Sequence, residues 1–457
     1  MTLLSQPRHR PALAALLLSA ALMGCGCQFD GSSIWEKHFS NSRKADAKRH
    51  WNDVRGDIQL QLAENHFEAG RLDEAEKVLE QALALAPDNA RVYVLATRLH
   101  LEKGDLAKAR IAISRAAALP GDGAEVEYLA GIVAQRYGDL EMALEHYAAA
   151  AIQEPQVAVY VLAQAETLVS LDKPIEAMEL IESRLEDFDG NAAMRMLAAH
   201  LNETFGLRGP AVEYAREALR IQKGDAGLAA EAGRIMVWAG QYEEAIAVLT
   251  PLVESASMGG GLTGQTNVGP ANSVSPSVMR DLARACLAVR RWREAQWALK
   301  PLMARDETDV AGWCMYAQAA LMLGDLDEAA ETIRTLHAGT APTPESLLLA
   351  AHIALSRGDH AGAYANASQA VQMDGQFATA FCLLGRACEG LGRGQEARQA
   401  YVKAMALEPE SPVAETLLNR LQQRDGPKTG PTGHGSARGP AVDKRNMTAD
   451  SFSKGEP

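Results

Sequence analysis

The stretch "GRLDEAEKVLEQALALAP", residues 70–87, contains an alanine whose position recurs along the chain at a fixed spacing. From Ala75 an alanine reappears every 34 residues as far as Ala245, and after one step of 50 residues to Ala295 the 34-residue spacing resumes. The ten members of the series are Ala75, Ala109, Ala143, Ala177, Ala211, Ala245, Ala295, Ala329, Ala363 and Ala397. A fixed period of this length indicates an array of one supersecondary unit rather than several separate domains.

Two further positions recur with the same period. Twelve residues before each alanine stands a small residue, and five residues before it a glycine is frequent. The small residues are Ala63, Thr97, Gly131, Ala165, Ala199, Gly233, Ala283, Ala317, Ala351 and Gly385, and the glycines are Gly70, Gly104, Gly138, Gly206, Gly240, Gly324, Gly358 and Gly392. Glycine is favoured just past a helix end, where the backbone turns left-handed. We therefore predict that each unit is a pair of antiparallel helices, with small residues where they cross.

With these positions the sequence resembles the tetratricopeptide repeat over residues 56–411. Two units match the pattern of the family best, one with Gly131, Gly138, Ala143, Tyr147, Ala150 and Pro155, the other with Phe381, Leu384, Gly385, Gly392, Ala397, Tyr401, Ala404 and Pro409. The resemblance implies an all-α fold, a right-handed α-solenoid of about ten helix-turn-helix repeats. An aromatic content of only 5 % also favours close-packed helices over sheets.

The series divides the chain into segments. Residues 1–24 read as a signal peptide, and residues 25–55 as a tether ending in an N-terminal capping helix. Repeats 1–6 are expected at 56–259 and repeats 7–10 at 276–411, separated by a Gly/Ser/Asn-rich insertion at 260–275 that is either a hinge or a tolerated loop. The amphipathic segment 412–424 is expected to cap the C-terminal end, and 425–457, rich in Gly and Pro, to form a disordered tail.

The N-terminal segment carries a membrane signal. Arg8 and Arg10 precede the uncharged run 11–24, which at fourteen residues is too short to span a bilayer comfortably. The run ends in Leu22-Met23-Gly24-Cys25, which resembles the lipobox of bacterial lipoprotein signal peptides. The resemblance implies cleavage before Cys25, acylation of its thiol and a place in the cell envelope. Because Gly26 is not the Asp that retains such proteins at the inner membrane, the expected address is the outer membrane. An ordinary cleaved signal and a short uncleaved anchor are the alternatives.

In the tetratricopeptide family the first helix of each unit lines a groove for peptides, and by this register one row of groove positions can be followed along the chain. The row is Glu64, Arg98, Ile132, Glu166, His200, Arg234, Arg284, Gln318, His352 and Arg386. From Arg234 onward it is basic or neutral, and Arg280 adds a charge. An acidic segment or a C-terminal carboxylate is the expected ligand of this half. A merely solvated helix face is the alternative.

A neighbouring row is apolar and includes Tyr128 and Leu348, with Trp238 close to it. The full row is Leu60, Val94, Tyr128, Leu162, Met196, Cys314, Leu348 and Cys382. Exposed, these side chains could hold a peptide; covered by adjacent repeats, they belong to the core.

Several classes of function are disfavoured by the sequence. No HExxH, GxSxG or Walker-type motif is present, so no catalytic residue, cofactor or metal ligand is assigned. The net charge of −13 argues against nucleic acid as a partner. Cys286, Cys314, Cys382 and Cys388 lie in helical patterns without CxxC spacing and are expected to be small core residues.

These patterns suggest a membrane-anchored periplasmic scaffold that binds other proteins in an envelope process such as pilus, outer-membrane, polysaccharide or peptidoglycan assembly. A soluble secreted binding module and a non-catalytic regulatory subunit of an envelope enzyme are the alternatives.

Overall fold

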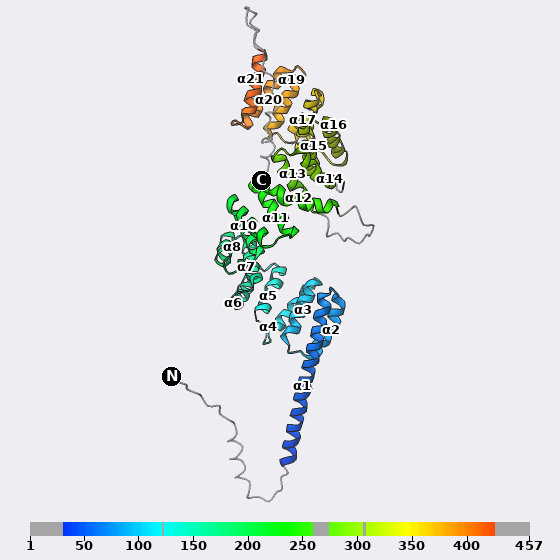
Figure 1. Cartoon of the computed structure of the whole chain (residues 1–457), viewed down its shortest axis with the longest axis vertical. Coiled ribbons are helices and arrows are strands. Elements are labelled where there is room, and N and C mark those ends of the chain that lie inside the picture. Colours follow the sequence, from blue (N-terminus) through cyan, green and yellow to red (C-terminus); the bar gives the residue numbers. More distant parts are fainter. Residues whose placement is uncertain (1–30, 121–122, 259–273, 305–307, 426–457) are drawn as a thin grey trace, which may run out of the picture. The chain divides into compact units, whose positions relative to one another are not determined.

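The computed structural model describes residues 31–120, 123–258, 274–304 and 308–425, and within these ranges all regular structure is helical (Figure 1). The helices are α1 (Gly31–Glu68), α2 (Leu72–Leu85), α3 (Ala90–Glu102), α4 (Leu106–Ala117), α5 (Gly123–Tyr137), α6 (Leu140–Gln153), α7 (Ala158–Ser170), α8 (Pro174–Arg184), α9 (Ala192–Thr204), α10 (Arg208–Ile221), α11 (Ala226–Ala239), α12 (Tyr242–Met258), α13 (Pro276–Ala288), α14 (Trp292–Met303), α15 (Val310–Leu323), α16 (Leu326–Gly339), α17 (Pro344–Arg357), α18 (His360–Met373), α19 (Ala378–Gly390), α20 (Gly394–Leu407) and α21 (Pro412–Asp425). The chain forms two compact units, residues 1–171 and 172–457. Cys25, the tail at 426–457 and most of the predicted insertion lie outside the described residues.

The ten recurring alanines all lie in the second helices of the repeats, and none of them is more than 1 % exposed. The small residues twelve positions earlier lie in the first helices and are buried as well. At Gly131 of α5, a Cβ atom would lie 2.5 Å from the ring of Tyr147 on α6. The two helices of the repeat therefore approach more closely than a larger residue permits, as the sequence predicts.

Each repeat turns between its helices through one left-handed residue. Eight of these positions hold the predicted glycines, with φ between 72° and 89°, whereas Asp172 has φ 60° and Arg290 has φ 63°. The turn is closed by a hydrogen bond from the next amide to a carbonyl five residues back, such as Arg291 N to Cys286 O at 2.8 Å. This bond is typical of a Schellman cap.

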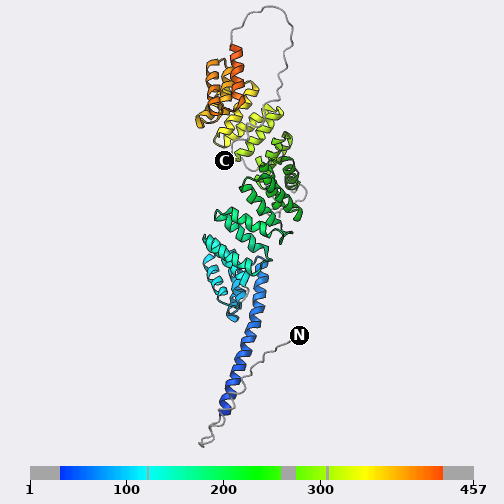
Figure 2. The same ribbon diagram turned by 90° about the vertical axis from the view of Figure 1, so that its left-hand side faces the viewer.

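The first helix differs from the sequence expectation. The predicted capping helix before residue 56 and the first helix of repeat 1 form one continuous helix, α1, of 38 residues. Gly56, Leu60 and Ala63 are buried where α1 packs against α2, whereas residues 46–51 are exposed. Figure 2 shows the first half of α1 running away from the other helices of its unit.

The structure also defines the start of repeat 7 after the insertion and the C-terminal end of the array. Ser275, the last residue of the predicted insertion, caps α13 by accepting a hydrogen bond from the Ser277 amide at 3.3 Å. At the C-terminus α21 occupies the predicted capping segment. Its Leu421 is fully buried in a cluster with Tyr401 of α20.

We predict that Arg290→Gly stabilises unit 2. A non-glycine residue in the left-handed region costs roughly 1–2 kcal/mol, and Arg290 is exposed, so that little packing is lost. Thermal unfolding followed by circular dichroism should show a higher Tm for the variant. The matched change Gly324→Ala, at φ 89°, should lower the Tm. An unchanged or lower Tm for Arg290→Gly would contradict this account of the turns.

Candidate protein-binding surface

Most of the apolar row of the first helices is core rather than a groove. Leu348 is 4 % exposed and packs with Leu347, Ala351 and Leu383. Of the row, Leu60, Val94, Met196, Leu348 and Cys382 are at most 8 % exposed. Leu348 is therefore not available to a peptide, because the neighbouring helices already cover it. Cys314 is partly exposed, and burial raises its pKa to about 12, so the thiol stays protonated.

The two predicted aromatic groove residues are partly buried. In unit 1 the ring of Tyr128 lies between Tyr147 and Tyr160, with centroid distances of 5.7 and 5.1 Å. Burial raises the pKa of Tyr128, and the charge of Glu166 on α7 adds to the effect. In unit 2, Trp238 stacks under the guanidinium of Arg208 at 5.8 Å.

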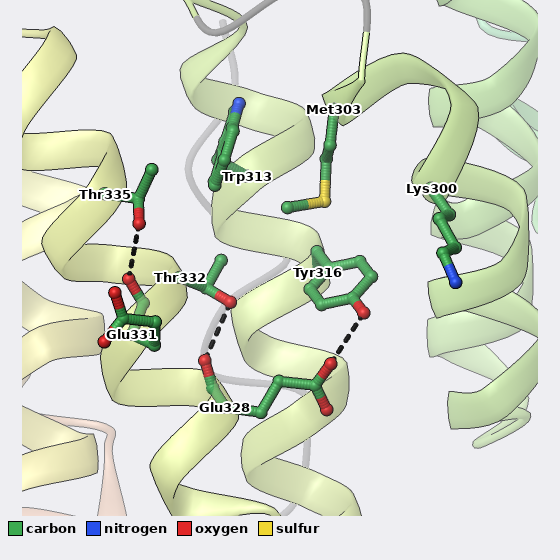
Figure 3. Close-up of a pocket in the computed structure, with 8 residues that line it drawn as sticks. All are labelled: Lys300, Met303, Trp313, Tyr316, Glu328, Glu331, Thr332 and Thr335. Carbon is green, nitrogen blue, oxygen red and sulfur yellow. Dashed lines mark hydrogen bonds between the residues drawn. The ribbon is translucent and has the colours of Figure 1, made fainter.

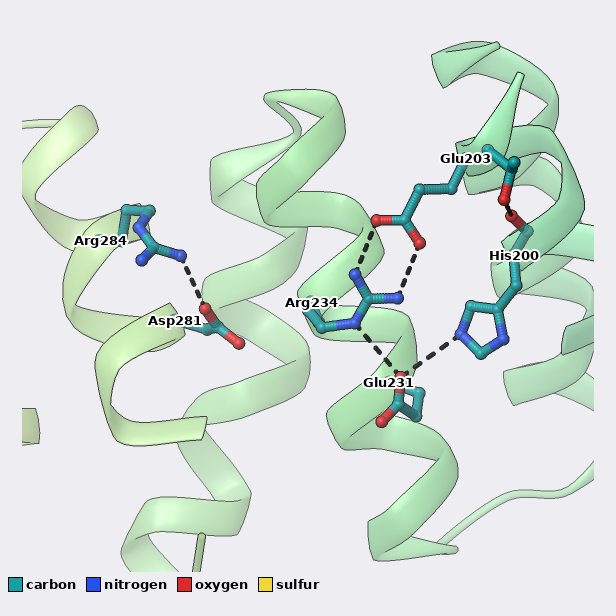
Figure 4. A network of polar contacts seen from close by, with 7 residues as sticks. His200, Glu203, Glu231, Arg234, Asp281 and Arg284 are labelled. Atoms are coloured by element: carbon teal, nitrogen blue, oxygen red, sulfur yellow. Dashed lines mark hydrogen bonds and ion pairs between the residues drawn. The ribbon is translucent and has the colours of Figure 1, made fainter. Parts of the chain in front are cut away.

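The charged row forms ion pairs between successive first helices of unit 2 (Figure 4). Arg234 of α11 donates two hydrogen bonds to the carboxylate of Glu203 on α9, at 2.6 and 2.7 Å. It also donates from Nε to Glu231 at 3.3 Å, and Glu231 lies 3.4 Å from Nε2 of His200. The hydrogen bonds that Arg234 donates to Glu203 raise the pKa of Arg234 further above its ordinary value. This bidentate geometry fixes α9 against α11.

The next helix, α13, contributes a second set of pairs. Arg284 donates to Asp281 at 2.9 Å, and Arg280 donates to Asp309, the residue before α15, at 2.9 Å. Burial raises the pKa of Asp281, although Arg284, Arg234 and Arg280 all oppose the shift. Arg234, Arg280 and Arg284 of the predicted basic half of the groove are thus paired with carboxylates.

His352 of α17 and Arg386 of α19 complete the predicted row. Burial lowers the pKa of His352 to about 4, and the charge of Arg386 contributes. The imidazole is therefore neutral at neutral pH and presents a hydrogen-bonding group without charge.

In unit 1, too, ion pairs connect successive first helices. Arg98 of α3 pairs with Glu125 of α5, and Arg91 lies 3.5 Å from Glu64 of α1. Within each unit, ion pairs made by residues of the row therefore connect neighbouring repeats.

Sequence reasoning missed a hollow of about 330 Å³ on α14, α15 and α16 (Figure 3). Trp313 and Met303 form apolar walls, and the hydroxyl of Tyr316 donates to Glu328 at 2.8 Å. Burial raises the pKa of Tyr316 to about 12, with Glu328 contributing. Lys300 lies at the edge. The residues come from three helices and share no motif, so no sequence signal marks the hollow.

The structure also bears on other kinds of site. Within the residues it describes, no group of His, Cys, Asp and Glu is arranged to hold a metal ion. No helix in those same ranges combines the length and apolar character needed to cross a bilayer.

Profiles of the family described as "Tetratricopeptide repeat" match residues 66–131, 280–341 and 348–412. Together with the paired helices and their fixed period, these matches define the class: the chain is a tetratricopeptide repeat protein. Repeats of this class bind other proteins and peptides and are generally non-catalytic.

Similar solved structures include Pseudomonas aeruginosa PilF, which is 18 % identical, with 44 % of this chain and 92 % of that chain covered and a TM-score of 0.40. A tetratricopeptide repeat protein from Parabacteroides merdae is 17 % identical, with 58 % and 99 % covered and a TM-score of 0.38. The Cut9–Hcn1 assembly of the APC/C is 12 % identical, with 85 % and 95 % covered and a TM-score of 0.40. No curated protein sequence matches the chain significantly.

Proposed function

We propose that this tetratricopeptide repeat protein is a lipid-anchored periplasmic scaffold. It holds protein partners in a cell-envelope assembly or export process, such as that of pili, outer-membrane proteins, polysaccharide or peptidoglycan. The observation that carries the anchor is the sequence Leu22-Met23-Gly24-Cys25 at the end of an uncharged run. Acyl chains on Cys25 would hold the protein at a membrane almost permanently, because each buried CH₂ contributes about 0.8 kcal/mol.

The start of α1 supports this arrangement. The helix begins at Gly31, six residues after Cys25, and 25 of its residues precede Gly56, where packing against α2 begins. At about 1.5 Å per residue they span about 37 Å. A helix of that length acts as a spacer that holds the repeats of unit 1 away from the bilayer surface.

The binding surface is proposed on the first helices of unit 2. Arg284 is the most accessible of the three paired arginines there, with 49 % of its side chain exposed and one ion pair, to Asp281 three residues earlier. We propose that a partner segment carrying both signs of charge binds along this row, with an acidic group at Arg284. Because Asp281 is buried, the acidic group of the partner would add to the Arg284–Asp281 pair rather than replace it. A guanidinium has five N–H donors, and the bond to Asp281 uses one on Nη1.

The anchor is tested by detergent partitioning of cell envelopes. We predict that the wild-type protein enters the detergent phase and that Cys25→Ser remains in the aqueous phase, because the variant cannot be acylated. Aqueous partitioning of both proteins would favour the soluble secreted module. Detergent partitioning of both would favour an uncleaved anchor.

The binding surface is tested by cross-linking the full-length protein in its own envelope and identifying the products by mass spectrometry. We predict that Arg284→Ala loses the partners that the wild type captures. Arg334→Ala is the matched control, because Arg334 also pairs with a carboxylate three residues earlier, Glu331, but lies on a second helix, α16. It should capture as the wild type does. If Arg284→Ala captures the same partners as the wild type does, the binding surface lies elsewhere.

A further inference from the structure

An apolar stripe lies exposed on α1, on the side away from α2. It consists of Trp51, Val54, Ile58 and Leu62, whose side chains are 62, 41, 60 and 42 % exposed. The spacing of three and four residues places them on one helix face. The opposite face, with Leu60 and Ala63, packs against α2. The stripe therefore has no cover among the described residues.

The residues at equivalent positions of the later repeats show how this face is covered elsewhere in the chain. Ile58 stands 17 residues before Ala75, and the residues at the same distance from the later alanines face the preceding repeat. Most of them are at most 7 % exposed: Val92, Val126, Tyr160, Met194, Val278, Ser346 and Ala380. Leu62 corresponds to Ala96, which is 3 % exposed. The stripe thus includes, at Ile58, the stacking position that most later repeats bury.

Inside the chain this face is covered by the second helix of the preceding repeat. Val92 and Ala96 of α3 share a hydrophobic cluster with Leu79 and Ala82 of α2. Because a short turn joins α2 to α3, the covering helix runs antiparallel to the helix it covers. The covering helix is amphipathic, and the apolar side with which it contacts the next repeat consists of alanine and leucine.

The C-terminal end of the array is closed differently. The outer residues of α21 include Glu415, Thr416, Asn419 and Arg420, all exposed. A polar outer face is what a terminal helix of a repeat array needs for solubility. The N-terminal end has the opposite character, and large exposed apolar patches mark interaction sites.

We infer that the stripe on α1 is a docking site for an amphipathic alanine- and leucine-rich helix of a partner protein. The helix binds antiparallel to α1, in the position that the second helix of a preceding repeat occupies elsewhere in the array. The site continues the stacking interface of the chain itself. It is separate from the surface of unit 2 and does not depend on acylation of Cys25.

The test uses a synthetic fluorescent peptide with the sequence of α2, residues 72–85, titrated with the full-length protein and followed by fluorescence anisotropy. We predict that the wild type binds the peptide and that Ile58→Glu weakens binding at least tenfold, because a carboxylate would be buried in the apolar contact. Ile111→Glu is the matched control, since Ile111 is 65 % exposed on α4, and it should bind as the wild type does. A peptide with Leu79→Glu should not bind.

Sedimentation velocity on the same proteins identifies the occupant. We expect a wild-type monomer. A wild-type dimer that Ile58→Glu converts to monomer would overturn the inference, because a second copy would then fill the face. Equal peptide binding by the wild type and Ile58→Glu, or none by either, would overturn it as well. Circular dichroism checks that Ile58→Glu is folded. If it is not, Trp51→Glu takes its place in the test, because Trp51 lies before the part of α1 that packs on α2. This second variant is also expected to weaken binding.

Discussion

The close approach of the two helices within each repeat is the constraint on which the rest of the structure depends. Repeat 3 shows it most clearly, since Gly131 of α5 leaves room for the ring of Tyr147, and Ala143 of α6 is completely buried. Burial of such side chains supplies the stabilisation, at roughly 1.5–3 kcal/mol for a large apolar residue. Because each repeat packs mainly on its neighbours, the same small residues must recur in every repeat.

Charge pairing adds specificity to this apolar framework. The bidentate contact of Arg234 with Glu203 and the contact of Arg280 with Asp309 each connect consecutive repeats of unit 2. Partly exposed pairs contribute little stability. On the proposed binding surface they would make recognition depend on the pattern of charge rather than on net charge.

Much of the fold could be predicted from the sequence because the packing constraint acts at single positions with a fixed period. The alanine series, the glycine turns and the C-terminal cap are of this kind. The continuity of α1 could not be predicted, because the segment before residue 56 has helical propensity in either case. That propensity fits a separate capping helix as well as an extension of the first helix of repeat 1. The hollow on α14–α16 arises from side chains of three helices and has no periodic signal.

The pairing of the basic row was missed for a different reason. The row follows one residue per repeat, whereas the acidic partners of its arginines stand at other positions. Asp281 lies three residues before Arg284, and Glu203 lies 31 residues before Arg234. A search for opposite charges at spacings just below one repeat could have found the contacts between repeats. The anchor at Cys25 remains a prediction from the sequence.

Amide hydrogen exchange of Gly131→Ala, measured by mass spectrometry, tests the close approach of the helices most directly. Overpacking a well-packed crossing costs about 1–3 kcal/mol, so exchange in α5 and α6 should accelerate about 5- to 150-fold. Gly209→Ala is the control, because Gly209 is also helical and a Cβ atom there meets nothing within 4 Å. That variant should exchange no faster than the wild type. Unchanged exchange in α5 and α6 of Gly131→Ala would contradict the claim that small residues at the crossings determine the fold.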